Sequence, residues 1–235
     1  MTSALLFGST GLTGSHILDT LAKLDSFSKI WTVSRREPKT KSAKLDAIIN
    51  ADTDTWTKAF SDIKPDAVIS ALGTTRAAAG GIQNQWKIDH DLNVAIAKQA
   101  KEQGIKTFVF VSSAGTRGFL SSFFPYSKMK IGVEDTIKDL GFEHAIILRP
   151  GGILGDREKP HAGGPLMNSA IRSLSKINQG LQDAVGQEAE VIARAAVHAV
   201  KLVGEGKAPK NPWVLEQADI VRLGRTEWKN VEPAA

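Results

Sequence analysis

Three glycines near the start of the chain constrain its fold more than any other feature. Gly8, Gly11 and Gly14 follow the apolar run Ala4–Phe7, which predicts a strand, and precede an amphipathic helical pattern over Ser15–Leu24. Glycine is needed where a strand turns sharply into a helix and the backbone approaches a pyrophosphate, and the free N–H groups of the helix start favour that anion. A merely tight turn is the alternative. The loop residues expected to hold a dinucleotide are Gly8, Ser9, Thr10, Gly11, Leu12, Thr13 and Gly14.

Strand-length apolar runs alternate with helical patterns along the rest of the chain. Strands are expected at 30–34, 47–49, 66–71, 107–111 and 145–148, helices at 88–103, 126–140 and 188–203, and short strands at 214–216 and 219–223. Continuous apolar strands separated by helices predict a parallel sheet covered on both faces. The expected fold class is α/β, a doubly wound, mostly parallel, Rossmann-like sheet with a small C-terminal lobe from residue 152. No linker marks a boundary, so residues 1–235 are expected to form a single NAD(P)-binding domain.

Composition removes several classes of function. The 235 residues include no cysteine, which excludes a disulfide framework and a thiolate zinc site, and the five histidines are scattered, so no metal is expected. The net charge of +5 is a mild basic excess without interleaved aromatic residues, and no nucleic-acid partner is expected. An anionic small molecule or membrane surface suits that sign equally well. No apolar run is long enough to span a membrane and no transit peptide is seen, so the sequence alone predicts a soluble, cytoplasmic protein.

The second expected strand ends at two arginines, Arg35 and Arg36. Arg35 lies 21 residues after Gly14, where an NAD-preferring site usually has an acid that holds the ribose 2′-hydroxyl. Guanidinium groups suit a 2′-phosphate, so we expect NADP(H), with a solvated basic loop as the alternative. Asp52 is expected either to accept from the adenine amino group or to cap a turn. The end of the next strand, where backbone could approach the cofactor, adds Ala71, Leu72 and Gly73, while Arg76 could face ligand or solvent.

The chemistry is expected at the next strand end and the helix after it. Ser112 and Ser113 end the strand, Tyr126 follows 13 residues after Ser113, and Lys130 lies four residues further on. That spacing places tyrosine and lysine on one helix face, where an ammonium favours the phenolate and makes the phenol a usable proton donor. A serine hydroxyl nearby could bind a developing alkoxide. The alternative is a surface helix with Lys130 in solvent. The phenylalanines Phe119, Phe123 and Phe124 are expected to be packing residues, with a substrate mouth as the alternative.

These residues together resemble the short-chain dehydrogenase/reductase superfamily in its extended or atypical branch. Longer segments resemble a fungal family known as "found in mitochondrial proteome" proteins, which is similar to the animal Tat-interacting oxidoreductase-like proteins. The segments are Ser70-Ala-Leu-Gly-Thr-Thr-Arg76, Val111-Ser-Ser-Ala-Gly115, Pro125-Tyr-Ser-Lys-Met-Lys130, Leu148-Arg-Pro-Gly151 and Glu216-Gln-Ala-Asp-Ile220. The resemblance spans nearly the whole chain.

The resemblance implies a role for each matching residue. Ser113 would be the catalytic serine with Ser112 as the alternative, Tyr126 the general acid/base, Lys130 the ribose-binding lysine, and Pro150-Gly151 would face the nicotinamide. It implies an NADP(H)-dependent oxidoreductase acting on a carbonyl/alcohol pair of unknown identity, or an NADP(H)-binding regulatory or scaffold protein. It also implies a peripheral protein on the cytosolic face of the mitochondrial outer membrane. A homodimer through the helices expected at 88–103 and 126–140 is left open.

Overall fold

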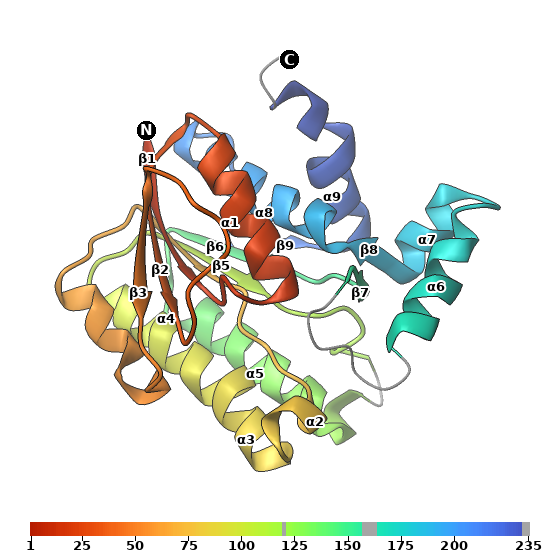
Figure 1. Ribbon diagram of the computed structural model, residues 1–235, viewed down its shortest axis with the longest axis horizontal. Coiled ribbons are helices and arrows are strands. Elements are labelled where there is room, and N and C mark those ends of the chain that lie inside the picture. Colours follow the sequence, from red (N-terminus) through yellow and green to blue (C-terminus); the bar gives the residue numbers. More distant parts are fainter. Residues whose placement is uncertain (119–120, 157–163, 232–235) are drawn as a thin grey trace.

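The computed structural model in Figure 1 describes residues 1–118, 121–156 and 164–231. At its centre lies a seven-stranded sheet in the order β3-β2-β1-β4-β5-β6-β9, with every neighbouring pair parallel. The order runs outward in both directions from β1 and β4, which confirms the expected doubly wound, Rossmann-like α/β fold. The strands are β1 (Thr2–Phe7), β2 (Phe27–Ser34), β3 (Leu45–Ile49), β4 (Ala67–Ser70), β5 (Thr107–Val111), β6 (His144–Leu148) and β9 (Trp213–Leu215).

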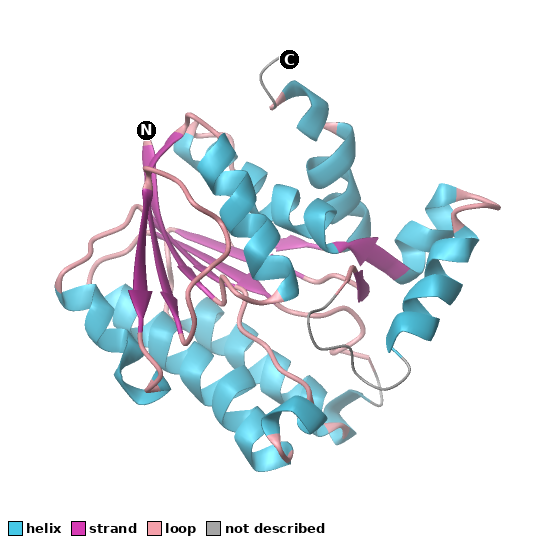
Figure 2. Cartoon of the chain, viewed as in Figure 1, coloured by secondary structure: helices cyan, strands magenta, loops and turns pink. Residues whose placement is uncertain are grey.

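Helices cover both faces of this sheet, as Figure 2 shows. One face is packed by α1 (Leu12–Lys23), α8 (Ala189–Gly204) and α9 (Gln217–Val221). The other is packed by a 3-10 segment (Thr53–Ser61), α4 (Asn93–Glu102) and α5 (Pro125–Asp139). Two short helices, α2 (Arg76–Ala79) and α3 (Ile82–Trp86), and a π-helical turn (Lys87–Leu92) lead into α4.

The first strand shows why a continuous apolar run suits this position. Ala4 and Leu6 point into the cluster beneath α1 and α8, whereas Leu5 and Phe7 point into the cluster beneath α4 and α5. All four side chains are fully buried. Burying a leucine or phenylalanine side chain contributes about 1.5–3 kcal/mol, so β1 ties the two layers together.

One expected strand is wrong. Residues 219–223 belong to helix α9 and to the π-helical turn that follows it (Arg222–Thr226). Glu216 and Asp219 form a reciprocal capping box, in which each side chain accepts a hydrogen bond from the other's backbone N–H. Such a box starts a helix, and the helical spacing then buries Ile220 and Leu223 on the same side.

The residues after 152 are divided between two places. β7 (Gly152–Leu154) and β8 (Gly186–Glu188) form a separate two-stranded sheet. Helices α6 (Gly164–Leu174) and α7 (Gln179–Val185) connect them and form the lobe at one end of the molecule in Figure 1. The chain then returns to the main sheet, because α8 packs on one face and β9 pairs with β6.

Candidate functional site

The glycine loop lies at the carboxyl end of β1, against the end of β4. Gly8 has a φ of +88°, and a Cβ there would lie 2.8 Å from the Ala71 carbonyl oxygen. A Cβ on Gly14 would lie only 2.0 Å from the carbonyl oxygen of Gly8. The Gly11 N–H donates to that same oxygen at 3.0 Å and closes the turn. The first and third glycines are therefore required by the fold of the loop itself.

This loop presents groups that fit a pyrophosphate. Helix α1 begins at Leu12, and its N-cap residue Gly11 has no side chain to accept from the first N–H groups. These donors and the positive end of the helix dipole favour an anion. The side chain of Ser9 is 1% exposed, and its Oγ has no hydrogen-bond partner within the described residues. Buried hydroxyls are normally hydrogen-bonded, so an unpartnered one in this loop is consistent with a ligand contact.

Arg35 and Arg36 directly follow β2, whose carboxyl end lies next to that of β1 and therefore next to the glycine loop. Both side chains are exposed, and the Ser34 hydroxyl donates to the Arg36 carbonyl oxygen at 2.6 Å, which orders the turn. Asp52 caps the 3-10 segment that follows β3, since its carboxylate accepts from the Asp54 N–H at 3.1 Å. The capping alternative for Asp52 is thus observed, and its contact with adenine stays a prediction.

The segment after β4 lies between the end of β1 and Lys130 of α5. The Ala71 N–H donates to the Phe7 carbonyl oxygen at 3.0 Å, and Leu72 is buried. A Cβ on Gly73 would lie 3.9 Å from the Lys130 Nζ and 4.0 Å from Asp89 Oδ1. Gly73 itself is exposed, as is Arg76 at the start of α2.

The two serines after β5 have different surroundings. Ser112 is buried, and its hydroxyl donates to Glu134 Oε1 at 2.5 Å. Ser113 is half-buried, and its hydroxyl makes a long contact of 3.4 Å with the Ala114 carbonyl oxygen. The Ser113 hydroxyl is therefore the one with freedom to contact a ligand.

Tyr126 and Lys130 lie in the first two turns of α5. Tyr126 is 40% exposed, whereas Lys130 is only 4% exposed. The Lys130 ammonium donates to the Val111 carbonyl oxygen at 3.3 Å and lies 4.8 Å from the centre of the Phe110 ring. The helix therefore points its lysine into the end of β5, and the alternative of a solvated Lys130 is wrong.

The end of β6 completes the site edge. The Ala114 N–H donates to the Pro150 carbonyl oxygen at 2.7 Å, which joins the segments after β5 and β6. The Gly151 N–H donates to Gln187 Oε1 at 2.8 Å, and a Cβ on Gly151 would lie 2.4 Å from the Val185 carbonyl oxygen. Pro150 and Gly151 therefore lie between the main sheet and the lobe.

Two groups near the site have no counterpart in the sequence interpretation. Asp89, on the π-helical turn, is 1% exposed, and its burial raises the pKa of its carboxyl, with the charge of Lys130 acting in the opposite direction. Glu134 is equally buried; burial alone would raise its pKa, but hydrogen bonds from Arg149, Ser112 and Arg117 hold that pKa below its usual value. Both residues lie within helical patterns, and nothing in those patterns indicates that they are buried.

The phenylalanines of the loop before α5 are exposed where they are described. Phe123 is 75% exposed and Phe124 is 61% exposed, which contradicts the expectation that they are packing residues. Phe119 lies outside the described residues. In the sequence only Pro125 separates Phe124 from Tyr126, which places the two exposed rings at the rim of the site.

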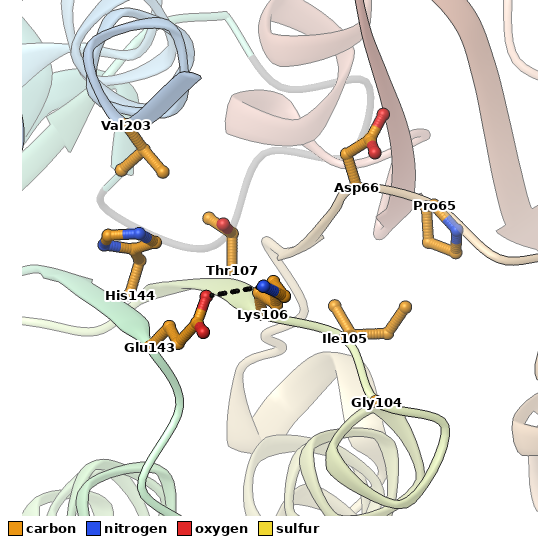
Figure 3. Close-up of a pocket in the computed structure, with 9 residues that line it drawn as sticks. All are labelled: Pro65, Asp66, Gly104, Ile105, Lys106, Thr107, Glu143, His144 and Val203. Carbon is orange, nitrogen blue, oxygen red and sulfur yellow. Dashed lines mark ion pairs between the residues drawn. The ribbon is translucent and has the colours of Figure 1, made fainter. Parts of the chain in front are cut away.

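A pocket at the opposite edge of the sheet is separate from this site. It has a volume of about 310 Å³ and is lined by the residues before β4, β5 and β6, among them Asp66, Lys106 and Glu143 (Figure 3). Lys106 and Glu143 form an ion pair across it at 3.2 Å. Ligands of open parallel sheets bind at the carboxyl ends of the strands, and this pocket lies at the amino ends.

Within the same described ranges, no three histidine, aspartate or glutamate side chains gather as a metal site. None of the described helices is both long and apolar enough to cross a membrane.

Comparison with solved structures shows a common fold. A UDP-Glc/GlcNAc 4-epimerase from Campylobacter jejuni matches with a TM-score of 0.67 at 15% identity, covering 94% of this chain and 82% of the other. A short chain dehydrogenase/reductase from Saccharomyces cerevisiae matches with a TM-score of 0.64 at 17% identity, covering 95% and 99%.

Comparison of sequences shows the family. The NAD dependent epimerase/dehydratase family matches residues 4–208. Protein fmp52-2, mitochondrial, from Aspergillus terreus is 59% identical over 97% of this chain and 100% of its own length. Protein fmp-52, mitochondrial, from Neurospora crassa is 60% identical over 97% of each chain. The chain therefore belongs to the NAD dependent epimerase/dehydratase family and, within it, to the Fmp52 proteins, as the sequence resemblance predicts.

Proposed function

We propose that this chain is an NADP(H)-dependent oxidoreductase that transfers hydride between the nicotinamide and a carbonyl/alcohol substrate. The observation that carries the proposal is the buried ammonium of Lys130 one helical turn from the half-exposed Tyr126. Both lie at the same sheet edge as a glycine loop whose N–H groups suit a pyrophosphate. Family membership supports a nicotinamide cofactor, since solved neighbours such as the WbmH enzyme of Bordetella bronchiseptica are described in complex with NAD+.

The cofactor half of the proposal rests on the loop after β1 and the end of β2. Gly8, Gly11 and Gly14 would hold the pyrophosphate, and Arg35 and Arg36 would bind the 2′-phosphate. Exposed guanidinium groups can form bidentate, charge-assisted bonds with a phosphate, which an NADH ribose lacks. Ala71, Leu72 and Gly73 would line the adenosine and Pro150-Gly151 the nicotinamide.

The chemical half rests on α5 and the end of β5. NADPH, when bound, supplies the hydride for reduction of the carbonyl carbon. The Ser113 hydroxyl would donate a hydrogen bond to the carbonyl oxygen, and the Tyr126 hydroxyl would give its proton to that oxygen as the alcohol forms. Lys130 would bind the ribose hydroxyls with the ammonium donors that Val111 does not use, and its charge would stabilise the phenolate left on Tyr126.

Replacement of Tyr126 by phenylalanine tests the chemistry. A panel of aliphatic and aromatic aldehydes and ketones would first identify a turned-over compound by its consumption of NADPH. We expect Tyr126→Phe to reduce turnover by about 10²–10⁴-fold, the usual contribution of general acid catalysis, with NADPH affinity unchanged. Unchanged turnover would show that the chain's only tyrosine is not the proton donor.

The cofactor preference has its own test. Arg35→Ala with Arg36→Ala should weaken NADPH binding by about tenfold or more, as for the loss of charge-assisted bonds, and leave NADH binding within about twofold. An equal loss of affinity for NADPH and NADH would contradict a 2′-phosphate site at these arginines. Fluorescence titration of each nucleotide measures both affinities.

A second function, an NADP(H)-binding regulatory or scaffold protein with little turnover, is favoured by the exposed rings at the rim. Phe123 and Phe124 present apolar surface next to the site, where a protein partner could sense the bound cofactor. Partner capture with and without NADPH separates the two functions. A partner bound equally well in both conditions would contradict this second function.

We also propose that the protein is peripheral on the cytosolic face of the mitochondrial outer membrane. The relatives carry the word mitochondrial in their names, and the basic net charge suits an anionic lipid surface. Assembly of a homodimer through α4 and α5 stays a prediction, which sedimentation of the purified protein would test.

A further inference from the structure

We propose that Asp89 is a positioning residue that acts through Lys130, tying the turn after β4 to the lysine ammonium so that both meet the cofactor in one arrangement. The inference rests on the proposed NADP(H)-binding function and adds to it a residue that contacts neither the substrate nor the reacting atoms.

Asp89 holds the turn after β4 through both of its carboxylate oxygens. Oδ1 accepts from the backbone N–H of Thr74 at 2.7 Å, and Oδ2 accepts from the side-chain amide of Gln85 at 3.2 Å. The same Gln85 nitrogen also donates to the Thr74 carbonyl oxygen at 3.1 Å. Asp89 and Gln85 therefore fasten the backbone of Thr74, next to Gly73, from both sides.

The π-helical turn brings Asp89 to this position. Residues 87–92 widen the helical path between α3 and α4, and Asp89 is the one buried residue of this turn. At the start of α4, the side-chain amide nitrogen of Asn93 donates to the carbonyl oxygens of Ile88 and Asp89 at 3.1 and 3.2 Å. Its amide oxygen accepts from the Ser70 hydroxyl at 2.5 Å. Single π-helical turns within α-helices are frequently associated with functional sites.

Lys130 reaches the same point from the other side. Its Nζ and Asp89 Oδ1 both lie within about 4 Å of where a Cβ on Gly73 would be, as the values of 3.9 and 4.0 Å state. A buried ammonium is costly unless an opposite charge lies close by, and Asp89 supplies that charge.

Other groups around Lys130 are engaged elsewhere. Its own helix brings Tyr126 and Glu134 to the positions one turn away, and Glu134 is held by Ser112, Arg117 and Arg149. From the π-helical turn, His90 packs on Gly132 of α5 and pairs with Asp91 at 2.8 Å. Strand β5 contributes the Phe110 ring and the Val111 carbonyl oxygen. Asp89 is thus the carboxylate that remains for the lysine in the described part of the chain.

A double-mutant cycle on NADPH affinity tests the inference on the full chain. The variants are Asp89→Asn, Lys130→Met and both together, with NADPH fluorescence as the readout and unfolding temperature as a check on folding. Asp91→Asn is the matched control, because Asp91 lies on the same turn with an exposed side chain. We expect Asp89→Asn to weaken binding by about five- to tenfold, a common size of coupling within one charged network, and the control to change it by less than twofold.

The decisive comparison is made in the Lys130→Met background. If Asp89 acts through the lysine, adding Asp89→Asn to Lys130→Met weakens NADPH binding by less than about twofold, because the group that Asp89 positions is already gone. A full five- to tenfold loss in both backgrounds, or no loss in either, overturns the inference while leaving NADP(H) binding intact. A wild-type chain that binds no NADPH would instead overturn the proposed function and the inference with it.

A second variant covers the case in which Asp89→Asn does not fold. Gln85→Ala removes one donor to Asp89 and one to Thr74 and leaves the charges of Asp89 and Lys130 in place. We expect a loss of about two- to threefold in NADPH affinity that also disappears in the Lys130→Met background. A loss of the same size in both backgrounds counts against the inference.

Discussion

At the residue scale, the loop glycines differ in the room that each leaves for a side chain. Alanine at 14 would place its Cβ 2.0 Å from the Gly8 carbonyl oxygen, whereas alanine at 11 would find the same oxygen at 3.3 Å. Gly11 also has a φ of −82°, which any residue adopts. We expect Gly14→Ala to weaken NADPH binding by about tenfold or more, equivalent to about 1.4 kcal/mol, and Gly11→Ala by less than about threefold.

Fluorescence titration with NADPH measures this difference between the two glycines. Circular dichroism of both variants would confirm that the sheet and helices are retained. Equal losses of NADPH affinity for the two substitutions would contradict the closer packing around Gly14.

Glu134 gives a second prediction at this scale, because it is a buried carboxylate held by two arginines. Arg149 donates to it at 3.1 and 2.6 Å and Arg117 at 3.0 Å, and its pKa in the folded chain lies below the ordinary value of 4.5. Its stabilising contribution is therefore fully present above about pH 4.5 and is lost as pH falls through the lower folded pKa. Glu134→Gln should cost about 3 kcal/mol at neutral pH, the size expected for breaking a buried ion pair.

Urea unfolding between pH 7 and pH 3 tests both the size of this stability loss and its dependence on pH. The difference in free energy of unfolding between wild type and Glu134→Gln should narrow as the solution becomes acidic, since wild-type Glu134 then also loses its charge. Asp135→Asn is the control: it breaks the exposed pair with Arg117 and should cost less than about 1 kcal/mol. A difference in free energy of unfolding that stays constant with pH would contradict a stabilising role for the Glu134 charge.

At the element scale, the sequence predicts those segments that carry their own pattern. Strands β1, β4, β5 and β6 are continuous apolar runs, and α4, α5 and α8 have helical spacing, so their positions could be predicted. Strands β7 and β8 could not, because each is three residues long, begins with glycine and exists only by pairing with the other. The error at 219–223 has a local cause, since the capping box at Glu216 and Asp219 outweighs a short apolar run.

The packing of α8 against the turn after α9 gives a prediction at this scale. A Cβ on Gly224 would lie 2.0 Å from the Val191 carbonyl oxygen in α8, so Gly224→Ala must push the two elements apart. We expect a loss of about 2–3 kcal/mol, at the upper end for forcing extra volume into a packed site. Gly204, at the end of the same helix α8, meets only Thr2 Oγ1 at 3.5 Å.

Gly204→Ala therefore serves as the matched control. It should be neutral or stabilise the protein by up to about 1 kcal/mol, because alanine favours helix over glycine. Denaturant unfolding of both variants gives the comparison. Similar stability for the two would show that α8 and the turn after α9 are not in close contact.

At the scale of the whole molecule, the candidate site is predictable where one sheet edge collects its residues. The glycine loop, Ser113, Tyr126 and Lys130 all lie at or just after carboxyl ends of strands, or in the helix that follows, so parallel topology brings them together. Asp89 could not be predicted in the same way. Its burial depends on a π-helical turn meeting the segment after β4, which lies 15 residues earlier in the chain. A contact between two separate segments cannot be predicted from the spacing of residues within either one.

The surface as a whole leads to the last prediction, which concerns attachment to membranes. A net charge of +5 favours anionic lipid, with about 1 kcal/mol for each lysine or arginine near the surface. We expect the protein to float with anionic vesicles at low salt and to be released near 1 M salt, where the screening length falls to about 3 Å. Zwitterionic vesicles are the control for charge, since they should not bind.

Apolar attachment would behave differently in the same assay. Ile177, Leu181 and Val185 are spaced four residues apart in and just before α7 and are 78%, 48% and 48% exposed, beside Lys176. Binding through these side chains would persist at high salt and would be weakened by Leu181→Ser, whereas charge-based binding should not respond to that substitution. Flotation that is insensitive to salt and abolished by Leu181→Ser would therefore contradict attachment by charge. It would indicate attachment through the apolar side chains of the lobe.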